Sequence, residues 1–243
     1  MMLAYSGIKF HNETWLIPEN IDYSKSAWFI SKKPELMKKN PLINLPYVVD
    51  GEVVVTQSNA CLSYLGRKLG YWGMNETEIT LCEQLLCEIY DLRNDVVRWS
   101  YPMNKPVKEY LEGVKSNGSL TKLEAYLAAN SFVSKDVNTP FLVGDHITAP
   151  DFHLWELLDQ FSLMAKFFQE EKAFLDDSRL PNIAAFYERF KALPRLQGYL
   201  QSKMATSIGC NNLSAKFGSL PSGAQYIPGA GPLPEDCSGV YQF

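Results

Sequence analysis

The sequence predicts a small α/β unit at the amino terminus followed by an all-helical domain. In the first part of the chain, apolar residues alternate with polar ones or run in β-branched stretches, as they do in strands. Beyond Asn75 the strand signal disappears, and apolar residues recur at spacings of three and four, as in helices. A chain of 243 residues, 46% of them apolar, can bury one large core or two modest ones. The change of pattern favours two domains, which we expect over residues 1–73 and 74–210.

Three elements are predicted in the amino-terminal unit. Residues 8–15 alternate between apolar and polar side chains, which predicts a half-buried strand. Residues 47–55 form two β-branched runs around Asp50-Gly51, a turn signal typical of an antiparallel hairpin. From Ser58 onward, apolar residues follow helical spacing until Gly70, which ends the predicted helix.

Five helices are predicted in the second domain from apolar residues at helical spacing. They cover residues 78–99, 120–129, 152–168, 182–191 and 195–204. Breaks between these segments are expected at Pro140, Pro181 and Pro194. Thr148 and Asp151 stand at the spacing of a capping box, in which two side chains satisfy amides at a helix start.

Charge and composition narrow the classes of partner. The formal net charge of −4 leaves no basic footprint for nucleic acid or for an anionic membrane surface. No apolar run approaches the roughly 20 residues that span a bilayer, and the first six residues are too short for a signal peptide core. We therefore expect an intracellular, cytoplasmic protein that acts on small molecules or proteins.

The cysteines predict neither disulfides nor a metal site. There are five of them, an odd number without paired spacing, which argues against a secreted disulfide framework. Cys82 and Cys87 lie in a helical pattern and fit small, reduced, buried residues, as does Cys61. The chain has three histidines, too few in this pattern to complete a metal site, so we expect no metal.

The segment 211–243 differs in composition from the rest of the chain. Glycine and proline are scattered through it, which predicts an extended tail without a core. Its aromatic residues, Phe217, Tyr226, Tyr241 and Phe243, are more than a linker requires. Two alternatives remain open: the tail frays, or these aromatics dock into pockets on another protein.

A ligand site is predicted where a strand that begins after a proline is followed closely in the sequence by the start of a helix. Pro46 enters the hairpin, and because X-Pro bonds are the ones that can be cis, Leu45 can turn its backbone toward a ligand. Gln57 and Ser58 stand where the following helix begins, so unpaired amides and the positive end of the helix dipole face that place. A small anion is the expected ligand.

Four sequence motifs together resemble the glutathione transferases, and most closely their mu class. The resemblance covers the chain from Tyr5 to about Met204. The motifs are Ser26-Ala27-Trp28, Lys32, Asn44-Leu45-Pro46-Tyr47 and Thr56-Gln57-Ser58-Asn59-Ala60. The resemblance implies a glutathione transferase-like fold, with a thioredoxin-like amino-terminal domain followed by an all-α bundle. It also implies glutathione as the substrate or bound ligand, and a homodimer.

The resemblance gives roles to residues that match the motifs of the glutathione site. Ser58 and Gln57 correspond to residues that bind the γ-glutamyl carboxylate, with helix capping as the alternative. Leu45, held by a cis Pro46, corresponds to the residue that exchanges backbone hydrogen bonds with the cysteinyl unit. The residues expected at the glycyl carboxylate are Trp28, Lys32 and Asn44.

Two further residues receive roles outside these motifs. Asp91 matches an acidic residue that reaches across the dimer interface to the ligand ammonium, with a surface charge as the alternative. Tyr101 matches a tyrosine that borders the electrophile pocket and donates to the developing negative charge, with packing beside Trp99 as the alternative.

The residue that activates the sulfur in this family has no match. In the family a first strand carries a tyrosine whose hydroxyl donates to the glutathione sulfur, and a helix follows it. Here residues 5–8 match the end of that helix and the second strand, so the first strand and most of the first helix are expected to be lacking. Tyr5 as the sulfur ligand is the alternative, but the distance to Trp28 leaves room for one strand and a loop only.

The expected gap has three explanations. In the family the first strand lies between the strand at Ile8 and the one at Tyr47. The native chain is longer, or the two flanking strands pair directly, or a partner covers the gap.

Two functions follow: a mu-like transferase that conjugates the glutathione thiolate to an electrophile, or a non-catalytic accessory subunit of a larger assembly that forms contacts through the gap and the tail.

Overall fold

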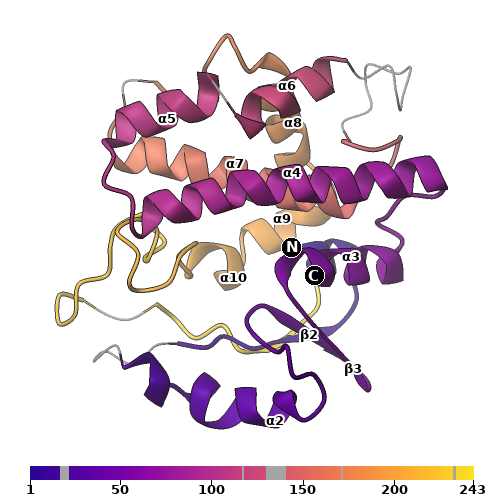
Figure 1. Ribbon diagram of the computed structural model, residues 1–243, viewed down its shortest axis with the longest axis vertical. Coiled ribbons are helices and arrows are strands. Elements are labelled where there is room, and N and C mark those ends of the chain that lie inside the picture. Colours follow the sequence, from indigo (N-terminus) through magenta and orange to yellow (C-terminus); the bar gives the residue numbers. More distant parts are fainter. Residues whose placement is uncertain (17–21, 117, 130–140, 171, 232–233) are drawn as a thin grey trace.

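The computed structural model describes the chain except for residues 17–21, 117, 130–140, 171 and 232–233 (Figure 1). A group of long helices lies at one end of the molecule, and strands with a flanking helix lie at the other. This arrangement confirms the predicted order of an α/β unit followed by a helical domain. The predicted break at Pro140 lies outside the described residues.

The amino-terminal unit begins with a short helix rather than a strand. The helix α1 ends at Gly7, which takes the left-handed conformation at a φ of 73° and so closes the helix. Only three residues of the predicted strand over 8–15 form β1. The elements are α1 (Met2–Ser6), β1 (Phe10–Asn12), η1 (Tyr23–Lys25), η2 (Trp28–Lys32) and α2 (Lys33–Met37).

The predicted hairpin and its following helix are confirmed. Strands β2 (Tyr47–Asp50) and β3 (Val53–Thr56) pair antiparallel, with Asp50 opposite Val53, so the connecting turn consists of residues 51 and 52. Gly51 adopts a φ of 59°, which glycine reaches without steric cost. Helix α3 (Ser58–Leu69) stops at Gly70 in the left-handed conformation, as predicted.

The strands form two separate pairs. β2 pairs with β3, whereas β1 pairs antiparallel with β4 (Gly239–Tyr241) at the far end of the chain. Among the described residues, no strand joins β1 to β2. The explanation in which the two flanking strands pair directly is therefore wrong, because β1 takes its partner from the carboxyl-terminal segment instead.

Four of the five predicted helices of the second domain are confirmed. The prediction of one helix over 195–204 is wrong, since that stretch is divided into three short turns, and α5 was not predicted. Pro181 and Pro194 stand at the first position of a helix, where the missing amide costs nothing. The elements are α4 (Glu76–Ser100), α5 (Val107–Ser116), α6 (Ser119–Ala128), α7 (Ala149–Phe167), α8 (Pro181–Lys191), η3 (Pro194–Leu196), α9 (Gln197–Leu200) and α10 (Lys203–Thr206).

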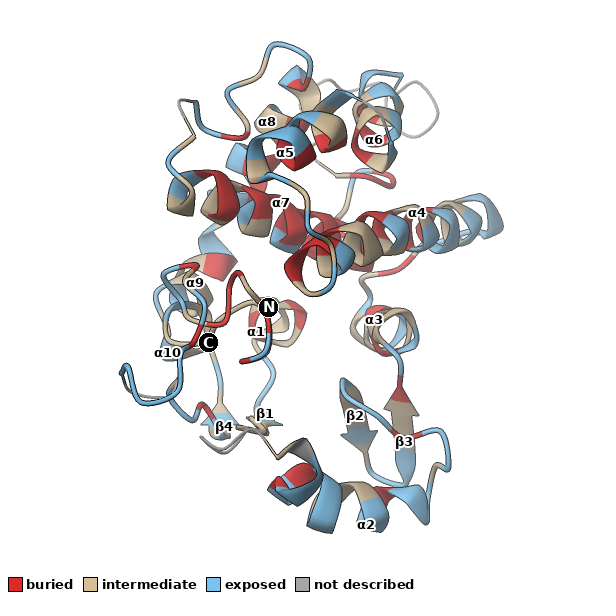
Figure 2. Ribbon diagram, turned by 60° about the vertical axis from the view of Figure 1, so that its left-hand side comes forward, coloured by how far each residue is buried: buried red, intermediate tan, exposed pale blue. Residues whose placement is uncertain are grey.

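Helix α7 runs through the middle of the main core and starts with the predicted capping box. It is the most deeply buried helix in Figure 2, with Leu158 and Phe161 fully enclosed. The Asp151 carboxylate accepts hydrogen bonds of 2.7 Å from the amides of Thr148 and Leu142, and a third from the Thr148 hydroxyl. Burial raises the pKa of Asp151 to about 6, against the opposing effect of these hydrogen bonds.

The expectation that residues 211–243 lack a core is wrong. Phe217 is fully buried and packs against Trp99 and Phe168 of the helical domain, and Tyr226 is buried as well. Phe243 stacks on Phe10 beside the β1–β4 pair. The aromatic residues of this segment therefore pack on their own chain, because it offers apolar surface at the end of α4 and along β1.

The predictions drawn from cysteine and membrane patterns can be compared with the described residues. All five cysteine thiols are free, and Cys61, Cys82 and Cys237 are buried. Within the described part of the chain, no group of three or more potential metal ligands occurs. None of the helices described here is both long enough and apolar enough to cross a bilayer.

Candidate functional site

The loop before β2 presents its backbone as the sequence predicts. The Leu45–Pro46 peptide bond is cis, and Leu45 is 44% exposed. Thr56, buried at the end of β3, fixes this loop: its hydroxyl donates to the Asn44 carbonyl at 2.7 Å and accepts from the Asn44 amide at 3.1 Å. The loop is thus held against the start of α3, with the Leu45 side chain at the surface.

The start of α3 is strained in a way that exposes hydrogen-bond donors. Gln57 precedes the helix with a φ of 75° and a ψ of 129°, a conformation that costs a non-glycine residue about 1–3 kcal/mol. Its side chain makes no cap hydrogen bond, and the half-buried Ser58 makes no side-chain hydrogen bond within the described part of the chain. Because the first amides of a helix lack intrahelical acceptors, the α3 start offers several donors to an anion.

Trp28 lies in the core of the amino-terminal unit. It is 3% exposed, and its ring stacks on Tyr47 at a centroid distance of 5.5 Å with planes 14° apart. Leu36 and Ile43 complete this small core cluster. The ring of Trp28 therefore packs in the core of the amino-terminal unit.

The Lys32 ammonium already has a carboxylate partner. It lies 3.3 Å from a Glu13 oxygen, and the Tyr47 hydroxyl donates to the other oxygen of the same carboxylate. Partial burial of Glu13 opposes ionisation, but the hydrogen bonds from Tyr47 and Lys32 prevail and lower the pKa of Glu13. A ligand carboxylate at Lys32 has to share this ammonium with Glu13.

A cleft of about 1100 Å³ separates the two strand pairs, and we call it the inter-sheet cleft. It is lined by α1, β1 and the residues after it, η2, α2, the loop before β2, β2 itself, α3, and Met204 and Ile208 at the end of the helical domain. Three of the predicted site residues, Lys32, Leu45 and Pro46, line it together. Figure 2 shows β1 and β2 on opposite sides of the space, with α2 below and α1 and α3 above.

Only two hydroxyl-bearing residues, Thr14 and Tyr47, line the inter-sheet cleft within the described part of the chain. The Tyr47 hydroxyl is committed to Glu13, and burial together with that hydrogen bond raises the pKa of Tyr47 above its usual range. Tyr5, the alternative sulfur ligand, packs its ring against Tyr71 and Phe152.

The remaining predicted residues lie apart from the inter-sheet cleft. Asn44, which is hydrogen-bonded to Thr56, and Gln57 and Ser58, which follow Thr56 in the sequence, do not line it. Asp91 is exposed on α4. Tyr101 follows the last turn of α4, and its hydroxyl accepts a hydrogen bond of 3.1 Å from the Asn212 amide.

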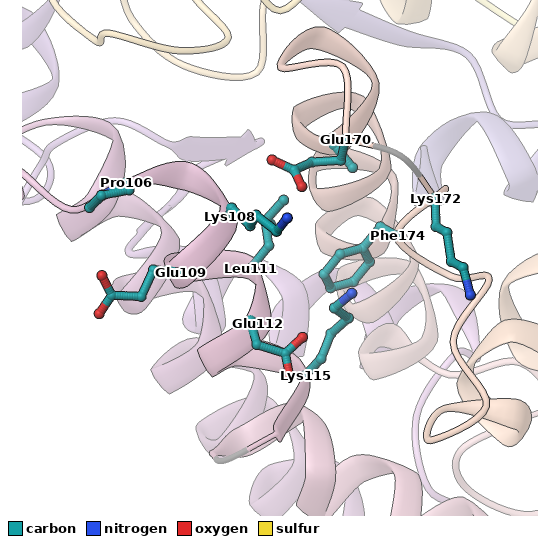
Figure 3. Close-up of a pocket in the computed structure, with 10 residues that line it drawn as sticks. Pro106, Lys108, Glu109, Leu111, Glu112, Lys115, Glu170, Lys172 and Phe174 are labelled. Carbon is teal, nitrogen blue, oxygen red and sulfur yellow. The ribbon is translucent and has the colours of Figure 1, made fainter.

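A second pocket, which the sequence did not predict, lies in the helical domain between α5 and the residues after α7. It has a volume of about 630 Å³ (Figure 3). The Lys115 ammonium stands over the Phe174 ring, 5.7 Å from its centroid, and pairs with Asp177 at 3.3 Å. Lysines and glutamates alternate around the rim, so this pocket has no single sign of charge.

Glu13, Tyr47 and Thr56 organise the site and were not predicted to do so. Thr56 and Tyr47 belong to the matched motifs, so the sequence already placed them near the predicted site. No local sequence pattern indicated a role for Glu13, because its partners Lys32 and Tyr47 lie 19 and 34 residues away in the sequence.

Comparisons with known proteins agree with this geometry. The protein-family model of the glutathione S-transferase N-terminal domain matches residues 17–67. The family model of the glutathione S-transferase C-terminal domain matches residues 90–203. Glutathione S-transferase Mu 1 of Oryctolagus cuniculus is 32% identical over 204 residues, which is 83% of this chain and 84% of that protein. The chain belongs to the glutathione S-transferase family.

Other relatives of this glutathione S-transferase homologue support the same assignment. Glutathione S-transferase Mu 3 of Homo sapiens is 29% identical over 223 residues, covering 91% of this chain and 89% of that protein. Among solved structures, the glutathione S-transferase Blo t 8 superposes with a TM-score of 0.59 at 25% identity, over 77% of this chain and 83% of that one. The pi-class enzyme of Onchocerca volvulus gives a TM-score of 0.58, also at 25% identity, over 75% and 81%. The predicted fold and the likeness to the mu class are therefore confirmed.

Proposed function

We propose that this protein binds glutathione within its amino-terminal domain, residues 1–73, and that residues 74–210 form the helical domain beside it. The observation that carries this proposal is the α3 start, where the Ser58 hydroxyl and the first helix amides lie next to the cis Leu45–Pro46 loop. The γ-glutamyl carboxylate binds Ser58 and Gln57, since an anion at a helix start accepts charge-assisted hydrogen bonds. The cysteinyl unit pairs with the Leu45 backbone as a short strand does.

The glycyl end of the ligand lies on the Lys32 side of the inter-sheet cleft. Lys32 supplies the charge and Asn44 an amide, while Trp28 stacks on Tyr47, whose hydroxyl bonds the Glu13 carboxylate paired with Lys32. Sharing Lys32 with Glu13 weakens this end of the site relative to a free ammonium. We therefore expect most of the binding free energy to come from Ser58, Gln57 and Leu45.

Conjugation of the glutathione thiolate to an electrophile is the activity we propose for this site, at a low rate. The thiolate is the nucleophile, so a hydroxyl donor that stabilises it governs the catalytic step. Of the cleft hydroxyls, that of Tyr47 is engaged by Glu13, and we propose that the family's sulfur-activating tyrosine has no counterpart. Tyr101, whose hydroxyl accepts a hydrogen bond from the Asn212 amide, is proposed to assist at the electrophile site.

Calorimetric titration with glutathione tests the binding proposal. We expect saturable binding, and Ser58→Ala should weaken it by about tenfold to a hundredfold, because a hydrogen bond to a charged group contributes about 1.5–3 kcal/mol. The matched control is Ser63→Ala, in the middle of the same helix, which should leave affinity unchanged. Absence of binding, or equal losses in both variants, contradicts the proposal.

A second candidate function is that of a non-catalytic accessory subunit. It is favoured by two strand pairs that leave the inter-sheet cleft between them, where a partner can bind. An assay of conjugation to an activated aryl halide separates the candidates: a rate well above the uncatalysed one excludes the accessory role, whereas binding without turnover supports it.

We also propose a homodimer in which Asp91 of one protomer reaches the ligand ammonium bound by the other. Asp91 is exposed on α4 and so accessible to a second copy. Sedimentation measures the dimer. Asp91→Asn should lower glutathione affinity without changing the unfolding free energy, and a variant that binds normally contradicts this role.

A further inference from the structure

The proposed glycyl end of the ligand site already contains carboxylates of the protein itself. Glu13 lies 3.3 Å from the Lys32 ammonium, and both residues line the inter-sheet cleft. Glu35, a more exposed residue of the same lining, lies 4.0 Å from that ammonium. One positive charge therefore faces two negative charges, and the local balance at Lys32 is acidic where a ligand carboxylate needs a cation.

The side chain of Glu13 is fixed by a second partner. The Tyr47 hydroxyl donates to the carboxylate oxygen that does not face Lys32. Tyr47 is itself held by its stack on the buried ring of Trp28, with planes 14° apart. Both oxygens of the Glu13 carboxylate are thus engaged, and the fold rather than a ligand determines where this negative charge lies.

The backbone around Glu13 is fixed as well, by the carboxyl-terminal segment. The Asn12 side-chain amide donates to the Cys237 carbonyl at 2.9 Å, and the Thr14 backbone amide donates to the Ser238 hydroxyl at 2.9 Å. These two bonds secure the residues on either side of Glu13. The carboxylate therefore belongs to a segment that is anchored before any ligand arrives, and its ordering adds no cost at the moment of binding.

The other lysines that line the inter-sheet cleft differ in how far they are committed. Lys39 pairs with Glu52 at 2.9 Å, and Lys68 pairs with Asp50. Lys9 is exposed and makes no ion pair with the described residues. A ligand carboxylate in the inter-sheet cleft thus meets one uncommitted lysine of the described lining, and that lysine is not the one predicted to bind it.

We propose that Glu13 makes the site select γ-glutamyl-cysteinyl thiols whose third unit ends in an uncharged hydrogen-bond donor, such as a carboxamide, over those that end in a free carboxylate. The inference rests on the proposed function, which places the third unit at Lys32. A ligand carboxylate has to displace Glu13 from this ammonium and is repelled by the carboxylate that it displaces. A carboxamide N–H instead donates to Glu13 and leaves the ion pair intact. Glutathione still binds through Ser58 and Leu45, but its glycyl carboxylate adds little affinity.

Calorimetry with two ligands tests this selectivity on the unaltered chain. The probes are reduced glutathione and the same tripeptide with a carboxamide in place of the glycyl carboxylate. We expect the carboxamide to bind at least as tightly as glutathione, whereas an uncommitted ammonium would favour glutathione by about fivefold. Tighter binding of glutathione overturns the proposal, leaves the proposed function standing and assigns the carboxylate to Lys9. Absence of binding by both probes overturns the proposal together with the proposed function.

A pair of variants separates Glu13 from a general effect of charge. Glu13→Gln keeps an acceptor for the Tyr47 hydroxyl but frees Lys32, so glutathione should bind about fivefold more tightly while the carboxamide gains nothing. The matched control is Glu52→Gln, which frees Lys39 in the same cleft lining and should change neither affinity. Equal gains in the two variants overturn the proposal, and so does an unchanged preference in Glu13→Gln. If Glu13→Gln fails to fold, the comparison of the two ligands on the unaltered chain still decides.

Discussion

At the scale of single residues, the strained backbone of Gln57 marks the place where fold and ligand binding meet. The residue stands between a β3 end fixed by Thr56 and a helix that begins at once, and the short connection leaves it a positive φ. Strain of this kind persists where the surroundings determine the conformation, and it is frequent at ligand sites.

Replacing Gln57 separates its backbone role from its side-chain role. Gln57→Gly should raise the free energy of unfolding by about 1 kcal/mol, because relief of strain exceeds the entropy cost of glycine. Gln57→Ala keeps the strain and should leave stability nearly unchanged. Both variants should weaken glutathione binding, because both remove the carboxamide. Chemical denaturation and calorimetry measure the two effects, and equal stability of the two variants would contradict the strain.

Thr56 is a residue whose effect extends to a whole loop. Thr56→Val removes the hydroxyl that bonds Asn44 but keeps its volume, so the variant should lose about 1–2 kcal/mol of stability and several-fold in glutathione affinity. Thr80→Val is the control, since its hydroxyl bonds a carbonyl within the exposed part of α4. An affinity loss in the control as large as that in Thr56→Val would argue against a special role for the loop.

At the scale of elements, an ion-pair network joins α5 to the connection between α7 and α8. Asp177 lies 3.3 Å from the Lys115 ammonium and 2.7 Å from Arg179, which in turn pairs with Glu112 at 2.6 Å. The side-chain hydrogen bond from Arg179 is the main cause that lowers the pKa of Asp177. Because Asp177 is largely enclosed, with 12% of its side chain exposed, the network is screened less than a surface pair.

The lowered pKa of Asp177 predicts a pH-dependent stability. In the unfolded chain this carboxyl has a pKa of about 3.9 and begins to bind a proton near that pH. In the folded protein the carboxylate stays ionised at the same pH. Its contribution is thus present above about pH 5 and is lost progressively as pH falls through about 4 toward the lowered pKa of the folded state. Asp177→Asn should cost about 2 kcal/mol at pH 7 and less at pH 3, measured by urea unfolding. The exposed neighbour Asp176→Asn should leave the free energy of unfolding at pH 7 nearly unchanged.

Local signals predicted the hairpin, helix α3 and four of the helices of the second domain. The Asp-Gly turn, the Gly70 stop and the Thr148–Asp151 box each depend on residues within four positions of one another. Helix α5 escaped prediction because only three of its ten residues are buried and Gly113 interrupts it. The contacts that decide the site's chemistry, Glu13 with Lys32 and Tyr47, join residues that are distant in sequence, and no periodicity encodes such pairs.

At the scale of the whole molecule, the carboxyl-terminal segment links the two domains. It covers the end of α4 with Phe217 and then continues to the amino-terminal unit, where β4 pairs with β1. Gln242 donates to the Gly7 carbonyl at 3.1 Å, so the last residues reach the end of α1. Composition predicted an extended path but not its destination, because both β1 and the end of α4 are remote in sequence from the tail.

Removing residues 239–243 should therefore destabilise a part of the protein distant in sequence. The truncated chain loses the β1 ladder and the stacking of Phe243 on Phe10, and we expect its unfolding free energy to fall by about 2–3 kcal/mol. Hydrogen exchange should show the amides of residues 10–12 losing protection. Val240→Ala, at a 60% exposed position of β4, should have little effect, and normal protection of β1 in the truncated chain would contradict the pairing.

The pairing of β1 with β4 also sets an order of events during synthesis. β1 is synthesised long before β4, its only strand partner among the described residues, because Phe10 pairs with Tyr241. Domains generally fold as units while translation proceeds. In this protein the pairing of β1 therefore has to follow the synthesis of β4.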